Sequence, residues 1–165
     1  MGAGKSTIGL LLSKELNSPF YDIDKVIEER AGANIPWIFD IEGEQGFRLR
    51  EEQTIEEITQ ITPAIVATGG GAVISAVNRA SLSSRGLVIY LKTTVEQQLE
   101  RTSKDKNRPL LQADSPRQVL TALMSEREPL YDQISDITIF TDKRHPRAVA
   151  ADILKKIQQK LSFSD

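Results

Sequence analysis

The chain has 165 residues, and its 21 Lys and Arg residues nearly balance its 23 Asp and Glu residues, which leaves a formal net charge of -2. This length is typical of one domain, and the even charge balance argues against a nucleic-acid partner. Cysteine is absent, so disulfides and thiolate metal sites are excluded, and no apolar run is long enough to span a membrane. We therefore expect a single domain over residues 1–165, located in the cytoplasm, without nucleic-acid or membrane partners.

The first residues, MGAGKST, match the second half of a phosphate-binding loop, whose full pattern is G-x-x-x-x-G-K-[ST]. Apolar residues at helical spacing follow in residues 6–16, and a helix that begins behind such a loop exposes backbone N–H groups to phosphates. The alternative is a chance match at the start of a helix. The sequence predicts a nucleotide site formed by Gly2, Ala3, Gly4, Lys5, Ser6 and Thr7.

The first glycine of this pattern would lie two places before Met1. In phosphate-loop folds a strand of the sheet comes directly before that glycine. We therefore expect a natural chain with roughly ten more residues at its N-terminus, enough for one strand. For the chain as it stands, we expect a gap in the middle of the sheet and weak or absent activity.

Residues 20–24, FYDID, predict a short strand that ends in two carboxylates, Asp22 and Asp24. Side chains two residues apart in an extended chain point to the same side, so the pair can serve a metal ion and a substrate hydroxyl. The alternative is an aspartate that only caps the helix predicted from Lys25 onward.

Residues 35–60 predict two helices that are broken near residues 43–46 by glycines. We expect Trp37, Ile38 and Ile41 to face inward from the first of these helices. Further strands are predicted near Ala64, Leu87 and Ile137, and further helices at residues 75–83, 95–101, 116–126 and 146–161. Strands that alternate with helices indicate a parallel sheet covered by helices.

The last predicted helix presents an apolar stripe of Val149, Ile153, Ile157 and Leu161. The single histidine, His145, directly precedes this helix beside Pro146. We interpret it as a surface residue without a catalytic role.

Three arginines and the TGGG segment at residues 68–71 are candidates for ligand contacts. Taken alone, Arg48 is interpreted as a solvated residue of a helix, and Arg108 and Arg127 are interpreted as surface charges. The glycines read as a tight turn, although three glycines after a strand also let the backbone approach a ligand closely. Arg108 lies in a polar loop from which a guanidinium can close over a phosphoryl group.

The motifs MGAGKST, FYDID, EGEQGFRLREE, ATGGG, KDKNRPLL and EREPLY occur in the order and approximate spacing of the shikimate kinase family, over essentially the whole chain. The chain resembles this family. The resemblance implies an α/β phosphate-loop kinase fold, a three-layer αβα sandwich with a short parallel sheet. It implies ATP, Mg²⁺ and shikimate as ligands and shikimate 3-phosphate as product, a step toward aromatic amino acids. It also implies a substrate-binding helical region at about residues 25–60 and a lid loop at about residues 102–115.

The resemblance assigns the acceptor side of the reaction to particular residues. Asp24 is similar to the residue that hydrogen-bonds the substrate hydroxyl and accepts its proton, whereas Ser6 and Asp22 are similar to contributors to the Mg²⁺ shell. Arg48 and Arg127 resemble the two arginines that grip the shikimate carboxylate. The substrate also contacts the backbone of residues similar to Gly69, Gly70 and Gly71.

On the nucleotide side, Lys5 and Arg108 resemble the catalytic cations that bind the ATP phosphates, and Arg108 would belong to the lid. Arg101 resembles an arginine that stacks on adenine. Arg144 falls where the family contacts the nucleotide base.

Two other functions stay open at the level of sequence. One is a kinase for another small polyol acid, such as gluconate, and the other is an inactive nucleotide-binding module. The presence of Lys5, Ser6, Asp24 and Arg108 together argues against an inactive module. We expect a monomer.

Overall fold

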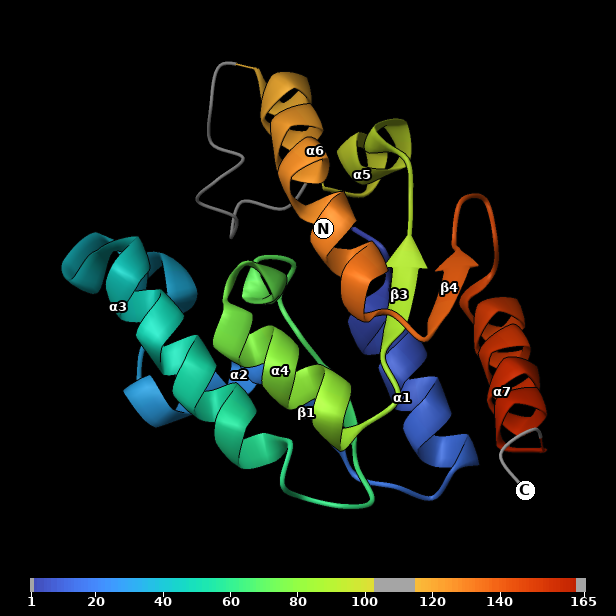
Figure 1. The fold of residues 1–165 in the computed structure, drawn as a ribbon. Coiled ribbons are helices and arrows are strands. Elements are labelled where there is room, and N and C mark those ends of the chain that lie inside the picture. Colours follow the sequence, from blue (N-terminus) through green and yellow to red (C-terminus); the bar gives the residue numbers. More distant parts are fainter. Residues whose placement is uncertain (1, 103–114, 163–165) are drawn as a thin grey trace.

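The computed structural model describes residues 2–102 and 115–162, in which helices and strands alternate along the chain (Figure 1). No helix within these ranges combines the length and apolar content that crossing a membrane requires. In chain order the elements are α1 (Lys5–Glu15), β1 (Phe20–Asp22), α2 (Ile23–Ala31), α3 (Ile35–Ile58), β2 (Ile65–Ala67), η1 (Ala72–Ile74), α4 (Ala76–Arg85), β3 (Ile89–Lys92), α5 (Val95–Thr102), α6 (Pro116–Ile134), β4 (Ile137–Phe140) and α7 (Pro146–Ser162).

The strands form two separate parallel pairs. In the first, β1 pairs with β2 and places Tyr21 opposite Val66. In the second, β3 pairs with β4 and places Tyr90 opposite Thr138. Among the described residues no ladder joins β2 to β3. The predicted short parallel strands are therefore confirmed, and the expected break in the sheet lies between the two pairs.

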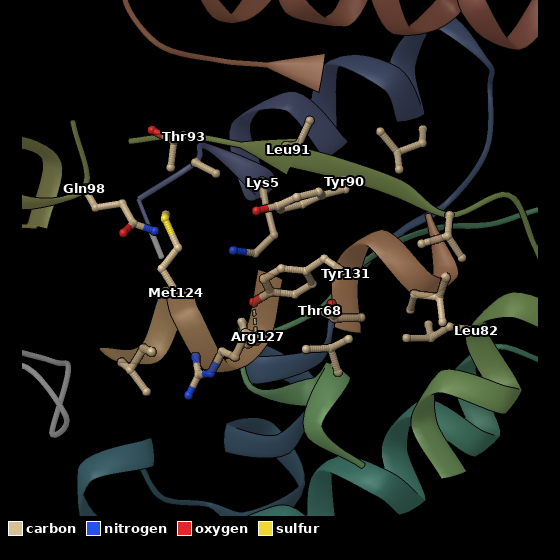
Figure 2. Close-up of a pocket in the computed structure, with 18 of the residues that line it drawn as sticks. Lys5, Thr68, Leu82, Tyr90, Leu91, Thr93, Gln98, Met124, Arg127 and Tyr131 are labelled. Atoms are coloured by element: carbon tan, nitrogen blue, oxygen red, sulfur yellow. Dashed lines mark hydrogen bonds between the residues drawn. The ribbon is translucent and has the colours of Figure 1, made fainter. Parts of the chain in front are cut away.

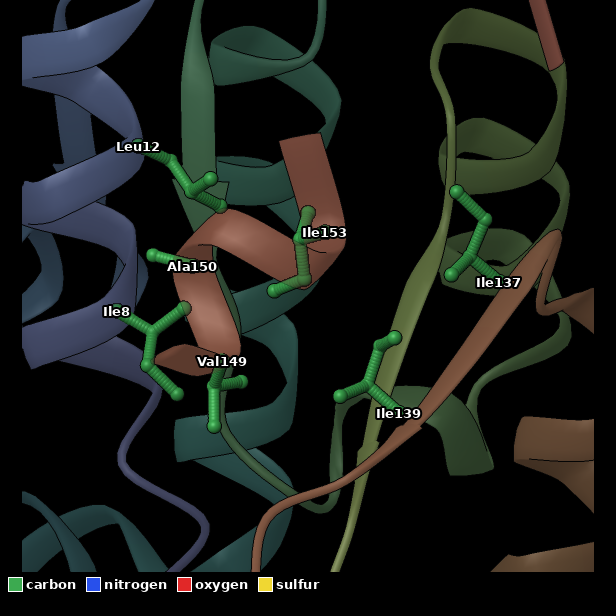
Figure 3. Packing of buried hydrophobic residues seen from close by; sticks show 7 residues of the cluster. All are labelled: Ile8, Leu12, Ile137, Ile139, Val149, Ala150 and Ile153. Atoms are coloured by element: carbon green, nitrogen blue, oxygen red, sulfur yellow. The ribbon is translucent and has the colours of Figure 1, made fainter. Parts of the chain in front are cut away.

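Each strand pair has its own buried apolar cluster, and burying one such side chain stabilises a fold by about 1.5–3 kcal/mol. Figure 1 shows the matching division of the helices, with α2, α3 and α4 on one side of the molecule and α7 on the other. The cluster beside β1 and β2 contains Ile23, Ile27, Ile38, Phe47, Ile55, Ile58 and Ala72. The cluster beside β3 and β4, shown in Figure 3, contains Ile8, Leu12, Ile137, Ile139, Val149, Ala150 and Ile153.

Glycines place the start of α1 beside β1. Gly4 precedes the helix with φ 83°, a left-handed conformation that glycine adopts without steric cost. Within α1, a Cβ at Gly9 would overlap the ring of Phe20 on β1. The close approach of α1 to β1 brings the end of that strand to the phosphate loop.

Helix α3 is interrupted at Gly43, whose φ of 71° and ψ of 178° are not helical. The predicted break is therefore confirmed, but the predicted inward face is only partly right. Ile38 is fully buried, whereas Trp37 is 51% exposed and Ile41 is 65% exposed. Trp37 points about 100° away from Ile38 around the helix axis, and Ile41 lies at the interruption, where the chain leaves the cluster.

Two predictions about the last helices are wrong. Helix α6 ends at Ile134 rather than near Glu126, since Pro129 is accommodated inside the helix on its exposed side. The carbonyl that loses its N–H partner there faces solvent rather than the core. In α7, Leu161 is 64% exposed because the helix extends beyond its cluster. The longer α6 matters for the site because it carries two functional side chains in its second half.

Candidate active site

The phosphate loop and the end of β1 are joined by a hydrogen bond. The Ser6 hydroxyl donates to Asp22 Oδ2 at 2.7 Å. Asp22 is also the N-cap of α2, and its Oδ1 accepts from the backbone N–H of Lys25 at 3.4 Å. The capping interpretation of Asp22 is therefore confirmed, while its second oxygen faces the phosphate loop.

The oxygens of Ser6 and Asp22 fit a divalent cation of the Mg²⁺ type. Mg²⁺ prefers oxygen ligands, and in phosphoryl-transfer sites it takes one or two from the protein and the others from phosphates and water. Within the described residues no group of three or more His, Cys, Asp or Glu residues would hold a metal ion alone. The protein would thus supply these two oxygens and the nucleotide would complete the shell.

Residues 69–71, here called the glycine turn, lie against charged side chains from two helices. A Cβ at Gly69 would lie 3.1 Å from Asp24 Oδ1 and 3.2 Å from Glu51 Oε1. A Cβ at Gly71 would lie 2.6 Å from Arg48 Nη1, so a side chain there would displace the Arg48 guanidinium. The backbone of the turn therefore approaches α2 and α3 more closely than other residue types would allow.

Arg48 and Glu51 form a largely buried ion pair beside this turn. Arg48 Nη1 donates to Glu51 Oε2 at 2.8 Å, and Nη2 donates to Glu44 Oε1 at 3.2 Å. Glu51 is 1% exposed, and its burial raises the pKa of its carboxyl group, although the charge of Arg48 opposes the shift. Its Oε1 has no hydrogen-bond partner among the described residues. Arg48 is thus held at the site rather than in solvent.

Helix α6 brings a buried cation and a hydroxyl to the same turn. Arg127 is 5% exposed, and its Nε has no hydrogen-bond partner among the described residues. One helical turn later, the Tyr131 hydroxyl donates to the carbonyl of Gly70. Burial raises the pKa of Tyr131, so its hydroxyl stays protonated at neutral pH. Arg127 is therefore not the surface charge that its sequence context alone suggests.

A cavity of about 110 Å³ extends from the phosphate loop to the glycine turn (Figure 2). Lys5 lines it from the phosphate loop, and Arg127 lines it from α6. It lies at the break between the strand pairs, since the residues that follow β2 and those of β3 both border it. Its apolar wall includes Leu82, Val88, Ile89, Leu91, Leu120 and Met124. One cavity therefore brings together the lysine of the phosphate-loop motif and a buried arginine.

The remaining predicted nucleotide residues lie at the ends of β3 and β4. Arg101 donates to the carbonyl of Gly2 at 2.7 Å and to that of Thr141 at 3.1 Å, which ties α5 to the phosphate loop. Arg144 instead donates to Asp152 of α7 at 3.3 Å. His145 is exposed, as predicted. Arg108 and most of the predicted lid loop lie outside the described residues.

Glu51 and Tyr131 are site residues that the sequence did not reveal. A weak signal existed, because Glu51 follows Arg48 by three residues and Tyr131 follows Arg127 by four, which places each pair on one helix face. Helical spacing does not tell which face is buried. The neighbouring Glu52 instead accepts a hydrogen bond from Ser75, at 2.5 Å.

Comparisons with known proteins point to one family. The family profile described as shikimate kinase matches residues 1–158. Shikimate kinase of Legionella pneumophila (strain Paris) is 58% identical over 155 residues, which cover 94% of this chain and 89% of the relative. That of Vibrio cholerae serotype O1 (strain ATCC 39315 / El Tor Inaba N16961) is 55% identical over 159 residues, which cover 96% and 91%.

Solved structures are similar over the same length. Shikimate kinase from Acinetobacter baumannii in complex with shikimate superposes with a TM-score of 0.95 at 48% identity, covering 97% of this chain and 89% of that one. The enzyme from Aquifex aeolicus gives a TM-score of 0.82 at 32% identity, covering 98% and 93%. Because the family profile covers residues 1–158 and relatives of this family are 55% and 58% identical over nearly the whole chain, the chain belongs to the shikimate kinase family, a family of phosphotransferases.

Proposed function

We propose that this protein transfers the γ-phosphoryl group of ATP to a hydroxyl of shikimate, which yields ADP and shikimate 3-phosphate. The observation that carries the proposal is the convergence of Arg48, Arg127 and Asp24 on the glycine turn. A substrate with one carboxylate and several hydroxyls matches two cations and one carboxylate arranged around backbone groups. Family membership and the Acinetobacter complex with shikimate support the same substrate.

The two arginines would bind the shikimate carboxylate. A buried cation without a full set of partners costs folding free energy, and an anionic ligand offsets that cost. Arg127 is such a cation, because its Nε lacks a partner among the described residues. Guanidinium groups bind carboxylates with two parallel hydrogen bonds, so the pair would also fix the orientation of the ring.

Asp24 would accept the proton of the reacting hydroxyl. Its Oδ1 lies beside Gly69 of the glycine turn. As the hydroxyl oxygen bonds to the γ-phosphorus and ADP leaves, the proton moves to the Asp24 carboxylate. Phosphoryl transfer has a loose transition state in which positioning and charge stabilisation dominate, so a weak base suffices.

The phosphates would lie at the N-terminus of α1, where backbone N–H groups and Lys5 face them. Mg²⁺ held by Ser6 and Asp22 would neutralise negative charge on the phosphates when bound. The roles of Arg101, Arg108 and Arg144 toward the nucleotide, the lid loop and the monomeric state stay predictions.

An assay of ADP release coupled to NADH oxidation tests the proposal, with shikimate present, omitted or replaced by gluconate. We expect ADP release only with shikimate, and mass spectrometry should identify one added phosphoryl group on it. Lys5→Ala is the control for contaminating kinases and should remove the signal. Turnover that requires gluconate, or that is independent of any acceptor, would contradict the proposal. ATP binding without turnover would instead favour the inactive nucleotide-binding module.

A further inference from the structure

Tyr131 contacts the glycine turn and interacts with Arg127, one turn earlier on α6, but has no assigned role in the chemistry itself. Its hydroxyl donates a hydrogen bond to the carbonyl of Gly70, and its ring stacks on Tyr90 of β3 with centroids 4.6 Å apart and planes 27° from parallel (Figure 2). The stack fixes the position of the aromatic ring, and the hydrogen bond fixes the position of the hydroxyl group. The side chain therefore joins α6, β3 and the glycine turn at one point.

The hydrogen bond from Tyr131 sets the direction of a backbone donor. A trans peptide group is planar, so the carbonyl of Gly70 and the N–H of Gly71 point in opposite directions. In the part of the chain that the structure describes, neither Gly70 nor Gly71 donates a hydrogen bond through its N–H. The carbonyls of Gly69 and Gly71 accept from Ala72 and Ile74, at 3.2 Å and 3.1 Å. The N–H side of the turn thus stays available to a ligand.

Three consecutive glycines cannot hold this orientation by themselves. Glycine lacks the Cβ that restricts φ and ψ, so a glycine run loses more conformational entropy on ordering than other residues do. The carboxylates beside Gly69 and the guanidinium above Gly71 limit the space around the turn. Hydrogen bonds from Ala72 and Ile74 orient the carbonyls of Gly69 and Gly71, and the Tyr131 hydroxyl orients the carbonyl of Gly70, which belongs to the peptide between Gly70 and Gly71.

We propose that Tyr131 is a positioning residue for the acceptor substrate, because its hydroxyl holds the peptide between Gly70 and Gly71 in the orientation that binds shikimate. The same hydrogen bond keeps that peptide in register with Arg127, one turn earlier on α6. The substrate carboxylate and ring hydroxyls then meet donors that are fixed relative to one another. This inference rests on the proposed function of the site.

Tyr131→Phe tests the inference, since it removes the hydroxyl and keeps the aromatic stack. We expect the KM for shikimate to rise about five- to tenfold, the effect of losing one hydrogen bond of about 1–1.4 kcal/mol. The KM for ATP and kcat should stay within about twofold of the wild type, because the phosphate loop is not involved. The Kd for shikimate, measured by calorimetry without nucleotide, should rise by the same factor as its KM.

The chain has three tyrosines, which provides a matched control. Tyr21→Phe, on β1, makes the same chemical change away from the glycine turn and should leave both KM values unchanged. A role in folding alone would lower the melting temperature of Tyr131→Phe and leave the ratio of the two KM values at its wild-type level. That result, or an unchanged KM for shikimate, would overturn the inference.

The two proposals fail in different ways. If the wild-type chain neither binds nor phosphorylates shikimate, the proposed function is wrong, and the positioning role of Tyr131 is then wrong as well. If the wild type is active and Tyr131→Phe binds shikimate equally well, only the positioning role is wrong. Thermal melting of both variants separates these outcomes from misfolding, since we expect shifts of no more than about 4 °C.

Discussion

Polar residues follow both strand pairs, but the two regions differ in whether their charged side chains find hydrogen-bond partners within the protein. In the segments that follow β3 and β4, Asp142 accepts hydrogen bonds from the Thr93 hydroxyl at 2.6 Å and from the Thr94 N–H at 3.2 Å. Although partial burial opposes it, these hydrogen bonds lower the pKa of Asp142. At the glycine turn, which follows β2, the buried Glu51 Oε1 and Arg127 Nε have no hydrogen-bond partner among the described residues.

The difference separates a structural network from a binding site. Buried polar atoms in folded proteins are nearly always hydrogen-bonded, so an exception requires an explanation. The exceptions that carry charge among the described residues both lie at the glycine turn. We infer that the glycine turn retains incompletely paired charges because a ligand completes them, whereas the charge of Asp142 is paired within the fold.

The largest expected effect comes from Asp24, which lies in the first turn of α2 rather than in the predicted strand. Asp24→Asn should lower kcat about 100- to 10,000-fold, because the amide cannot accept the proton of the reacting hydroxyl. The KM for shikimate should change little, since the amide keeps the shape and the hydrogen-bonding oxygen. The ADP-release assay measures both constants.

Asp142→Asn is the matched change on the β3–β4 side. It weakens the hydrogen bonds from Thr93 and Thr94, so we expect a lower melting temperature and a kcat within about twofold of the wild type. A loss of kcat in this variant similar to that of Asp24→Asn would contradict the division between the two sides.

A smaller effect is expected from the buried ion pair on α3. Glu51→Gln removes the charge that holds Arg48, and charged hydrogen bonds contribute about 1.5–3 kcal/mol, so the KM for shikimate should rise at least about tenfold. The control is Glu42→Gln, which breaks the exposed pair that Glu42 forms with Arg50 at 2.7 Å and 2.8 Å. Exposed pairs contribute little, so this variant should stay within about twofold. Equal effects would show that burial does not distinguish the two pairs.

Crowding at the glycine turn should have a weaker effect still. Gly71→Ala would place a methyl group against the Arg48 guanidinium, which is the mobile end of a side chain and can shift. We expect the KM for shikimate to rise about threefold, with little change in melting temperature, since only a side-chain end moves. Gly86→Ala adds the same methyl group where no atom lies within 4 Å, and it should change neither quantity.

The smallest effect concerns pH and a contact remote from the turn. Hydrogen bonds from Arg85 at 2.7 Å and Ser81 at 2.8 Å lower the pKa of Glu56 from 4.5 to about 2. Since the folded-state pKa lies below the unfolded one, this contact stabilises the fold above the unfolded pKa of 4.5 and is lost as the pH falls from there toward about 2. Urea midpoints measured from pH 6 to 2 should fall less steeply for Glu56→Gln. An identical slope in both proteins would refute the assignment.

Local features predicted most of the elements. The phosphate loop predicted α1, short apolar runs predicted the four strands, and Gly43 predicted the break in α3 because a left-handed φ is a property of the residue itself. The exposure of Trp37 and Ile41 was not predictable in this way. Helical spacing shows which residues share a face, but another part of the chain decides whether that face is covered.

The sequence by itself determined which types of residue form the site: a lysine that follows glycines, aspartates that follow a strand, arginines on two helices and a run of glycines. It could not separate Glu51 from Glu52, or a surface arginine from Arg127. Only the tertiary structure decided these, because α2, α3 and α6 meet at the glycine turn from distant parts of the chain. Burial, and with it the raised pKa of Glu51 and the unpartnered Nε of Arg127 among the described residues, arises from that convergence.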